Sequence, residues 1–405
     1  MRYIVLERKQ AREVFNGEDQ MKVIREKWKS AMTDRERFNR QMHYQSVDRS
    51  FNMEFGYWDE NFTQWDIFTG NGIKTNEEAD IFFSFDRIEN IGAGTLNRLV
   101  NLWNAAFMSP QFEVREIEVR DGKRIIINED GLLAEVPLEN AGSSIPHFLK
   151  SSITTPEDWK KMKEERFDLK HPSRTLDIEE IKKFFPSDEE RDFPLGIYCG
   201  SMIGRIRDML TFEGLAYATY DYPDMVEDMV ETVCLLIENF IDQLLPHFKF
   251  DFAAGWEDIC FNHGPIVSLD FFREVVVPRY KRINKKLKKY GIDIWYTDCD
   301  GDVRPLLPYF LESGINCLFP YEVNSCAHPG ELLDKYDGEL RIMGGVDKMR
   351  LGEGPEAIKK YLKSLEKYVA RGGYIPFCDH RCPPNVKPKD YLYYLDLKEK
   401  MFGMG

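Results

Sequence analysis

Residues 293–302 read DIWYTDCDGD, an apolar, strand-like run that ends abruptly in the carboxylates of Asp298, Asp300 and Asp302. Alternate residues of a strand share one face, so a strand that continued to Asp302 would present all three acids together, whereas a turn at Gly301 would swing Asp302 away. Like charges at this spacing repel, and a bound cation, a basic partner or a shared proton has to offset them. The alternative interpretation is a solvated acidic loop that caps the following helix.

The same pattern, an apolar run followed by a segment of helix length, recurs along the second half of the chain. After Pro194 the runs are LGIYCG, FDFAAGWEDIC, IDIWYTDCDG, INCLFPYEV, LRIMGGVD and GGYIPFCDHR. Alternating strands and helices predict a parallel sheet that is buried on both faces. With residues 51–55 and 81–85 as two further strands the total is eight, which favours a (β/α)8 TIM barrel over a doubly wound sheet.

Two segments depart from this alternation of strands and helices. Residues 1–50 are charged and permissive for helix, and they predict an N-terminal helical extension. Residues 111–137 alternate apolar and polar side chains around two Asp-Gly turns, which predicts a small β-meander insertion. We therefore expect one barrel domain over residues 51–405, with the meander inserted in it.

Composition narrows the class of protein. The 405 residues are 43% hydrophobic, which is enough for a large core, and the net charge of −14 without a basic block argues against nucleic-acid binding. No run of about 18 apolar residues predicts a membrane span. Charges interrupt the N-terminal MRYIVLERKQ, so we expect a cytoplasmic protein. The eight cysteines form no C-x-x-C pair, which argues against a disulfide scaffold or a zinc finger.

Polar residues follow most of the apolar runs, and in a barrel the C-terminal strand ends gather the functional side chains. The predicted catalytic residues are Glu257, Asp298, Asp300 and His380. Asp298, Asp300 and His380, with Glu257 or Glu322 as a fourth ligand, suit Zn²⁺ or Mn²⁺, because carboxylates and imidazole both bind such cations. Without a metal the same groups could relay a proton. The sequence leaves both chemistries open.

Other residues near these positions each have a structural and a functional interpretation. Tyr57 and Trp58 belong to a dense aromatic group that forms either packed core or the wall of a ligand site. Arg205 lies just beyond a strand end, where it could hold an anion or only form a salt bridge. Cys378 and Cys382 flank the histidine and are candidate metal ligands, whereas the cysteine between the two aspartates is expected to pack on the other face.

Taken in order, several segments of the chain resemble the uroporphyrinogen decarboxylase superfamily, and within it the branch of cobalamin-dependent methyltransferases. The segments are ERFNRQMHYQSVDRS, GYWDENFTQW, GWEDICFNHGPIVSLDFFREVVVPRYKRI, YTDCDGDVRPLLPYFLESGINCLFPYE, MGGVDK and GGYIPFCDHRCPPNVKPKDYLYYL. The resemblance covers nearly the whole chain. It implies the same barrel, with a cleft at the C-terminal ends of its strands.

The departures from this family narrow the implied activity. Uroporphyrinogen decarboxylases carry an arginine-bearing M-R-Q-A-G-R-Y segment after the first strand, where this chain has FNMEFGYWDE. The thiol methyltransferases of the branch bind zinc through H-x-C and a later Cys, and the matching positions here are Asp298, Asp300 and His380. Replacing the two thiolate ligands with a carboxylate and an imidazole makes the site harder and favours a substrate that presents oxygen rather than sulfur.

The resemblance therefore implies a methyltransferase that takes a methyl group from an O-methyl donor, such as an aryl methyl ether. The acceptor would be the cob(I)alamin of a separate corrinoid protein, with a divalent metal such as Zn²⁺ as a further candidate cofactor and a homodimer as a candidate assembly. The alternatives are a decarboxylase, a methylcobalamin:thiol methyltransferase and a non-catalytic corrinoid-binding scaffold. The expected substrate-binding residues are Tyr57, Trp58, Trp256, Trp295, Glu322 and Arg205.

Overall fold

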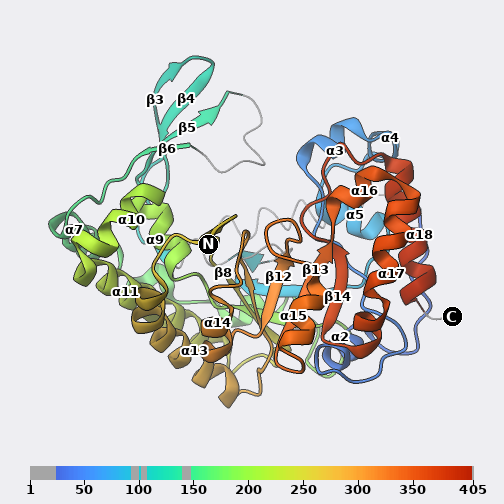
Figure 1. The fold of residues 1–405 in the computed structure, drawn as a ribbon. Helices are drawn as coiled ribbons and strands as arrows, with labels where there is room; N and C mark the ends of the chain where they lie inside the picture. The colour runs from blue at the N-terminus through green and yellow to red at the C-terminus, as the bar shows by residue number, and fades with distance from the viewer. Residues whose placement is uncertain (1–23, 93–99, 102–106, 139–146, 404–405) are drawn as a thin grey trace.

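A computed structural model describes residues 24–92, 100–101, 107–138 and 147–403, and an eight-stranded parallel sheet lies at the centre of this part of the chain (Figure 1). Five of its strands, β1, β7, β11, β12 and β14, are buried along their whole length, as expected where both faces of a sheet are covered. The α/β class and the parallel sheet are therefore confirmed. In spatial order the strands are β14 (Tyr374–Cys378), β13 (Arg341–Val346), β12 (Cys317–Tyr321), β11 (Trp295–Asp298), β8 (Phe252–Trp256), β7 (Leu195–Tyr198), β1 (Glu89–Gly92) and β2 (Val100–Asn101).

Helices between the strands cover the sheet. The longest are α11 (Pro223–Leu244), α13 (Val277–Lys289), α17 (Pro355–Arg371) and α18 (Pro388–Phe402). Helices α11, α17 and α18 begin with a proline, where the missing N–H costs nothing, whereas α13 continues from the π-helical turn Phe272–Val276. None of the described helices is long and apolar enough to cross a bilayer. The shorter helices are α2 (Asp34–Met42), α3 (Asp59–Gln64), α4 (Asp66–Thr69), α5 (Asn76–Phe82), α7 (Pro156–Arg166), α8 (Ile178–Lys182), α9 (Ile203–Leu210), α10 (Phe212–Asp221), α12 (Leu269–Phe271), α14 (Leu307–Ser313), α15 (Pro329–Lys335) and α16 (Lys348–Glu353).

All six strands predicted after Pro194 are present, but the strand predicted at residues 81–85 is wrong. Ile81 lies in α5, because Thr75 and Glu78 form a capping box that starts a helix in front of it. The strand of the central sheet comes later in the chain, at β1.

Residues 51–55 are buried, but they do not form the predicted strand. Side chains take the place of a backbone ladder here: the Phe51 N–H donates to the Gln41 Oε1 at 2.7 Å, and the Asn52 N–H donates to an Asp86 carboxylate oxygen at 2.9 Å. Single hydrogen bonds connect the segment to both neighbours, from the Asp86 N–H to the Asn52 carbonyl and from the Cys378 N–H to Glu54. No ladder among the described residues joins β14 to β1, so the closed barrel stays a prediction.

The insertion is a separate antiparallel sheet of β3 (Arg115–Arg120), β4 (Lys123–Ile127), β5 (Leu133–Pro137) and β6 (His147–Lys150). Figure 1 shows it standing away from the central sheet, above α9 and α10. Strand β6 lies beyond the predicted boundary at residue 137. Of the predicted N-terminal extension, residues 1–23 lie outside the described part of the chain, and α2 begins at an N-cap formed by Thr33. The division into an extension and a single domain stays a prediction.

We expect the ion pair between His43 and Asp293 to make stability depend on pH. Their side chains are 3.0 Å apart, and the hydrogen bond to Asp293 raises the pKa of His43 above its ordinary 6.5, while the same bond lowers the pKa of Asp293. The pair is therefore fully charged from above the ordinary pKa of Asp293 up to pH 6.5, and its contribution is lost as pH rises through the raised pKa of His43. His43→Gln should cost stability in urea unfolding at pH 6 and almost none at pH 9; an equal cost at both values would contradict this.

Candidate active site

Three carboxylates meet at the C-terminal ends of two neighbouring strands. Asp258 follows β8, while Asp298 ends β11 and Asp300 follows it, and these residues offer carboxylate oxygens that all lie within 4.8 Å of one another. The register of the sheet explains the meeting, because Trp256 is paired with Asp298. Asp258 was missed as a site residue in the sequence analysis. Its position at a strand end, like that of Asp298, was the available signal.

The turn at Gly301 separates Asp302 from this cluster. Gly301 has φ +87°, and a Cβ at this position would lie 2.5 Å from the Cys260 carbonyl oxygen, so only glycine fits. Asp302 instead pairs with Arg304 at 2.7 Å. Cys299 is buried and forms a side-chain hydrogen bond with Cys260, as expected for a packing residue, and that bond raises its pKa.

The carboxylates of the cluster repel one another, and a bound cation could reduce this repulsion. Burial raises the pKa of Asp258 to about 6, and the negative charge of Asp300 adds to the shift. The Asp300 N–H donates to Asp258 at 3.0 Å, but its own Oδ1 is buried and has no hydrogen-bond partner among the described residues. Closely spaced oxygen donors with one of them unpartnered fit a hard or borderline divalent cation.

His380, which follows β14, lies beside Asp300 rather than inside the tight cluster. Its Nε2 is 3.4 Å from the Asp300 Oδ2, and its ring packs edge-on against Phe55 at 5.2 Å between centroids. The predicted group of Asp298, Asp300 and His380 is thus brought to one place, with Asp258 as the third member of the tight cluster. Nearby, Cys378 and Cys382 are buried and in contact with each other, and burial raises the pKa of Cys378.

Glu257 was predicted to be catalytic, but its contacts give it a structural role. Its carboxylate is fully buried and accepts hydrogen bonds from the Met202, Ile203 and Gly204 N–H groups at 2.8–3.0 Å, and from two hydroxyl groups, those of Ser201 and Tyr280. Both oxygens are therefore occupied at the start of α9. The side chain fixes this helix, and no oxygen of Glu257 is exposed to receive a substrate.

Two of the four aromatic residues predicted to bind substrate are core residues instead. Tyr57 is fully buried and shares a hydrogen bond with the Tyr391 hydroxyl at 2.7 Å. Trp295 is 2% exposed and packs against Tyr280 of α13, because strand alternation turns it toward the helices while Asp298 turns to the other face. These two assignments are corrected.

The other two aromatic residues lie where a ligand could reach them. Trp256 is half-buried, and its indole donates a hydrogen bond to Asp258. Trp58 is 40% exposed, and its N–H donates to the Cys382 carbonyl at 3.3 Å, two residues beyond His380.

The remaining predicted residues are paired with other side chains. Glu322 forms a 2.7 Å ion pair with Lys348 and accepts a long hydrogen bond from the Gly301 N–H, so it lies at the turn that ends the cluster. Lys348 was missed, because nothing in its local sequence distinguishes it from a helix-start lysine. Arg205 pairs with Asp130 of the insertion at 3.4 Å and packs on Phe107, so it ties the insertion to α9.

We expect this cluster to bind a divalent cation. Asp258→Asn should weaken Mn²⁺ binding in isothermal titration by roughly tenfold or more, because one anionic donor is lost. The same change should raise the melting temperature of the metal-free protein, since it relieves repulsion and asparagine tolerates the φ of +49° found there. Asp302→Asn is the matched control and should leave Mn²⁺ binding unchanged. If wild-type protein shows no saturable Mn²⁺ binding, the prediction of a cation site is wrong.

Comparison with known proteins identifies the family. The family described as uroporphyrinogen decarboxylase (URO-D) matches residues 134–400. Among solved structures, a methyltransferase from Methanosarcina mazei is similar, with a TM-score of 0.52 and 12% identity over 92% of this chain and 100% of that chain, which shows a shared fold. A comparison with curated proteins finds no match. The matched segment covers most of the sequence, and the chain therefore belongs to the uroporphyrinogen decarboxylase family, as its resemblance implied.

Proposed function

We propose that this protein is a methyltransferase that moves a methyl group from an O-methyl donor, such as an aryl methyl ether, to the cob(I)alamin of a separate corrinoid protein. The observation that carries the proposal is the cluster of Asp258, Asp298 and Asp300, with His380 beside it. Membership of the family and the fold shared with a methyltransferase support the same class of reaction. The proposed scaffold is the closed barrel, with residues 51–57 completing the wall between β14 and β1.

The donor atoms of the cluster favour an oxygen-bearing substrate. A thiol is best activated as a thiolate bound to a soft site, and soft sites are built from cysteine. Here the positions that match the thiol branch hold Asp298, Asp300 and His380, and the described cysteines are in none of the groups that could hold a metal. Thiol methyl transfer is therefore the weaker candidate.

Decarboxylation of a porphyrinogen is also weakly supported. That reaction needs cationic side chains to hold the carboxylates of the substrate, and the segment FNMEFGYWDE at residues 51–60 has none. The one acidic side chain deep in this segment, Glu54, is buried in an ion pair with Lys398 at 2.7 Å. Neither residue is accessible to a substrate.

In the proposed reaction the reduced corrinoid supplies the nucleophile, and the bond from the methyl carbon to the donor oxygen breaks. A bound cation would supply Lewis-acid polarisation of that oxygen, held by Asp258, Asp298 and Asp300. His380 is partly exposed, so its imidazole can deliver a proton to the departing oxygen, while its Nε2 lies 3.4 Å from the Asp300 Oδ2, a contact that orients the ring. Trp256, beside Asp258, is left as the aromatic residue best placed to pack the donor.

The test is methyl transfer from a series of methoxylated donors to free cob(I)alamin, followed as methylcob(III)alamin by absorbance. Asp300→Ala and His380→Ala should lose roughly 10²-fold or more with the poorest leaving group, the range found when an acid or electrostatic stabiliser is removed. The loss should shrink as the leaving oxygen becomes more acidic, because such donors depend less on assistance. Asp302→Ala, which lies outside the cluster, is the control.

Two results would contradict the proposal. Equal losses across all donors, in variants that keep the wild-type melting temperature, would leave these residues a positioning role only. Wild-type protein that transfers no methyl group from any donor, but releases CO₂ from a carboxylated tetrapyrrole, would favour the decarboxylase.

A further inference from the structure

Helix α10 carries a row of exposed aromatic side chains at the same end of the sheet as the candidate site. Tyr217 is 63% exposed, Tyr220 is 78% exposed, and Phe212 and Tyr222 at the two ends of the helix are also exposed. The inner face of the helix holds the buried Leu215 and Ala218, so Tyr217 and Tyr220 lie on the outer face. Large exposed rings gathered on one helix are uncommon on a surface that meets only water, and they mark interaction sites.

The exposed charges on this surface are negative. Glu213, Asp221 and Asp224 lie among the exposed rings, and none of them forms an ion pair with another described residue. On the neighbouring helix α11, by contrast, Asp228 pairs with Lys163 at 2.7 Å. Tyrosine rings with unpaired carboxylates between them attract lysine and arginine, by cation–π contact and by charge.

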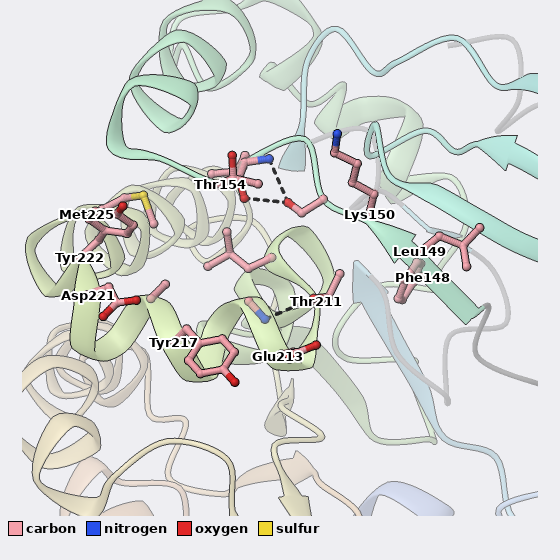
Figure 2. A pocket seen from close by; sticks show the side chains of 15 residues that line it. Phe148, Leu149, Lys150, Thr154, Thr211, Glu213, Tyr217, Asp221, Tyr222 and Met225 are labelled. Atoms are coloured by element: carbon pink, nitrogen blue, oxygen red, sulfur yellow. Dashed lines mark hydrogen bonds between the residues drawn. The ribbon is translucent and has the colours of Figure 1, made fainter.

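A cavity of about 510 Å³ opens between α10 and strand β6 of the insertion (Figure 2). The buried side chains of Leu210, Ala218 and Met225 form its floor, while the exposed Glu213 and Asp221 also line it. The aliphatic stem of a lysine or arginine would fit against such a floor and leave its charge near the two acids. Lys150 of β6 is the cation among the lining residues, so acids outnumber bases in the cavity.

Contacts of the Phe212 ring lead from this surface toward the candidate site. The Phe212 ring lies 5.0 Å from the Phe261 ring, and Phe261 accepts the Asp302 N–H at 2.9 Å through its carbonyl. On the inner side, the guanidinium of Arg207 lies 5.0 Å from the Phe212 ring and 4.9 Å from the Trp256 ring. A protein seated on α10 would therefore border the mouth of the site.

We infer that the outer face of α10, together with the cavity beside β6, is the docking surface for a partner protein that presents a basic face. The inference rests on the proposed function, under which this partner is the corrinoid carrier. It assigns the recognition to exposed tyrosines and unpaired carboxylates outside the cluster, and it predicts that a lysine or arginine of the partner enters the cavity.

The experiment compares two methyl acceptors, free cob(I)alamin and the corrinoid protein of the same organism reconstituted with cobalamin. Two double variants are tested, Tyr217→Ser/Tyr220→Ser and Asp221→Asn/Asp224→Asn. In each, the KM for the corrinoid protein should rise at least tenfold, while the rate with free cob(I)alamin stays at the wild-type value. Tyr290→Ser is the control, because Tyr290, which is 42% exposed, is a surface tyrosine at the C-terminal end of α13. Added salt should weaken the wild-type interaction and affect the acid variant less.

The outcomes separate this inference from the proposed function. Variants that match wild type with the corrinoid protein, or that lose equally with both acceptors, would overturn the docking surface. If wild-type protein transfers no methyl group to either acceptor, the proposed function fails. The docking surface is then tested separately, by the dissociation constant of the complex with the corrinoid protein, measured by analytical ultracentrifugation. In that case binding that the tyrosine variant weakens tenfold would support the surface, and absence of wild-type binding would overturn it.

Discussion

The register between β8 and β11 is the constraint on which the candidate site depends. Trp256 is paired with Asp298, so Asp258 and Asp300, two residues further along their chains, leave neighbouring strands at the same level. A slip of one residue would turn every side chain of a strand to its other face, and the buried apolar residues on both faces forbid it. The core thus holds three carboxylates together against their mutual repulsion, which isolated loops would relieve by moving apart.

Buried polar contacts from α9 hold the exit of β8 in a conformation that it would not adopt alone. Asp258 has φ +49°, in the left-handed region, and Arg207 donates a hydrogen bond to its carbonyl oxygen. Glu257 binds the first N–H groups of the same helix. The insertion is fixed to the other end of α9, where the Ser151 hydroxyl donates to the Met209 carbonyl at 2.6 Å. One short helix therefore connects the insertion, the proposed docking surface and the cluster.

Buried ion pairs take the place of a backbone ladder at residues 49–55, before the single parallel bridge between Tyr57 and Cys382. Arg49 pairs with Asp86 at 2.6 Å, and Glu54 pairs with Lys398 at 2.7 Å while also accepting the Tyr394 hydroxyl. Such pairs add little net stability, because desolvation offsets the attraction, but the loss of one partner leaves a buried charge and is costly. They therefore specify the position of a segment that lacks regular strand hydrogen bonds.

The sequence by itself determined the strands after Pro194, because a strand buried on both faces has to be a short, nearly continuous apolar run. It also predicted the acidic character of the candidate site, since Asp298, Asp300 and His380 each lie at or just beyond the end of such a run. It predicted helix within residues 1–50, where the structure has α2. The strand predicted at residues 81–85 is wrong because the capping box of Thr75 and Glu78 starts a helix that includes the first part of this apolar run.

Only the tertiary structure decided which side chains face the site. In a strand, successive side chains point to opposite faces of the sheet, but a continuous apolar run has no polar residues to show which side chains face the site. The sequence therefore could not show that Trp295 packs on α13, on the face opposite to Asp298. For the same reason the sequence predicted Glu257 as the site residue, whereas the structure places its neighbour Asp258 in the cluster. Segments such as 51–57, whose hydrogen bonds go to the distant residues Gln41, Asp86 and Cys378, have no local signal, because their partners are brought close only when the whole sheet has formed.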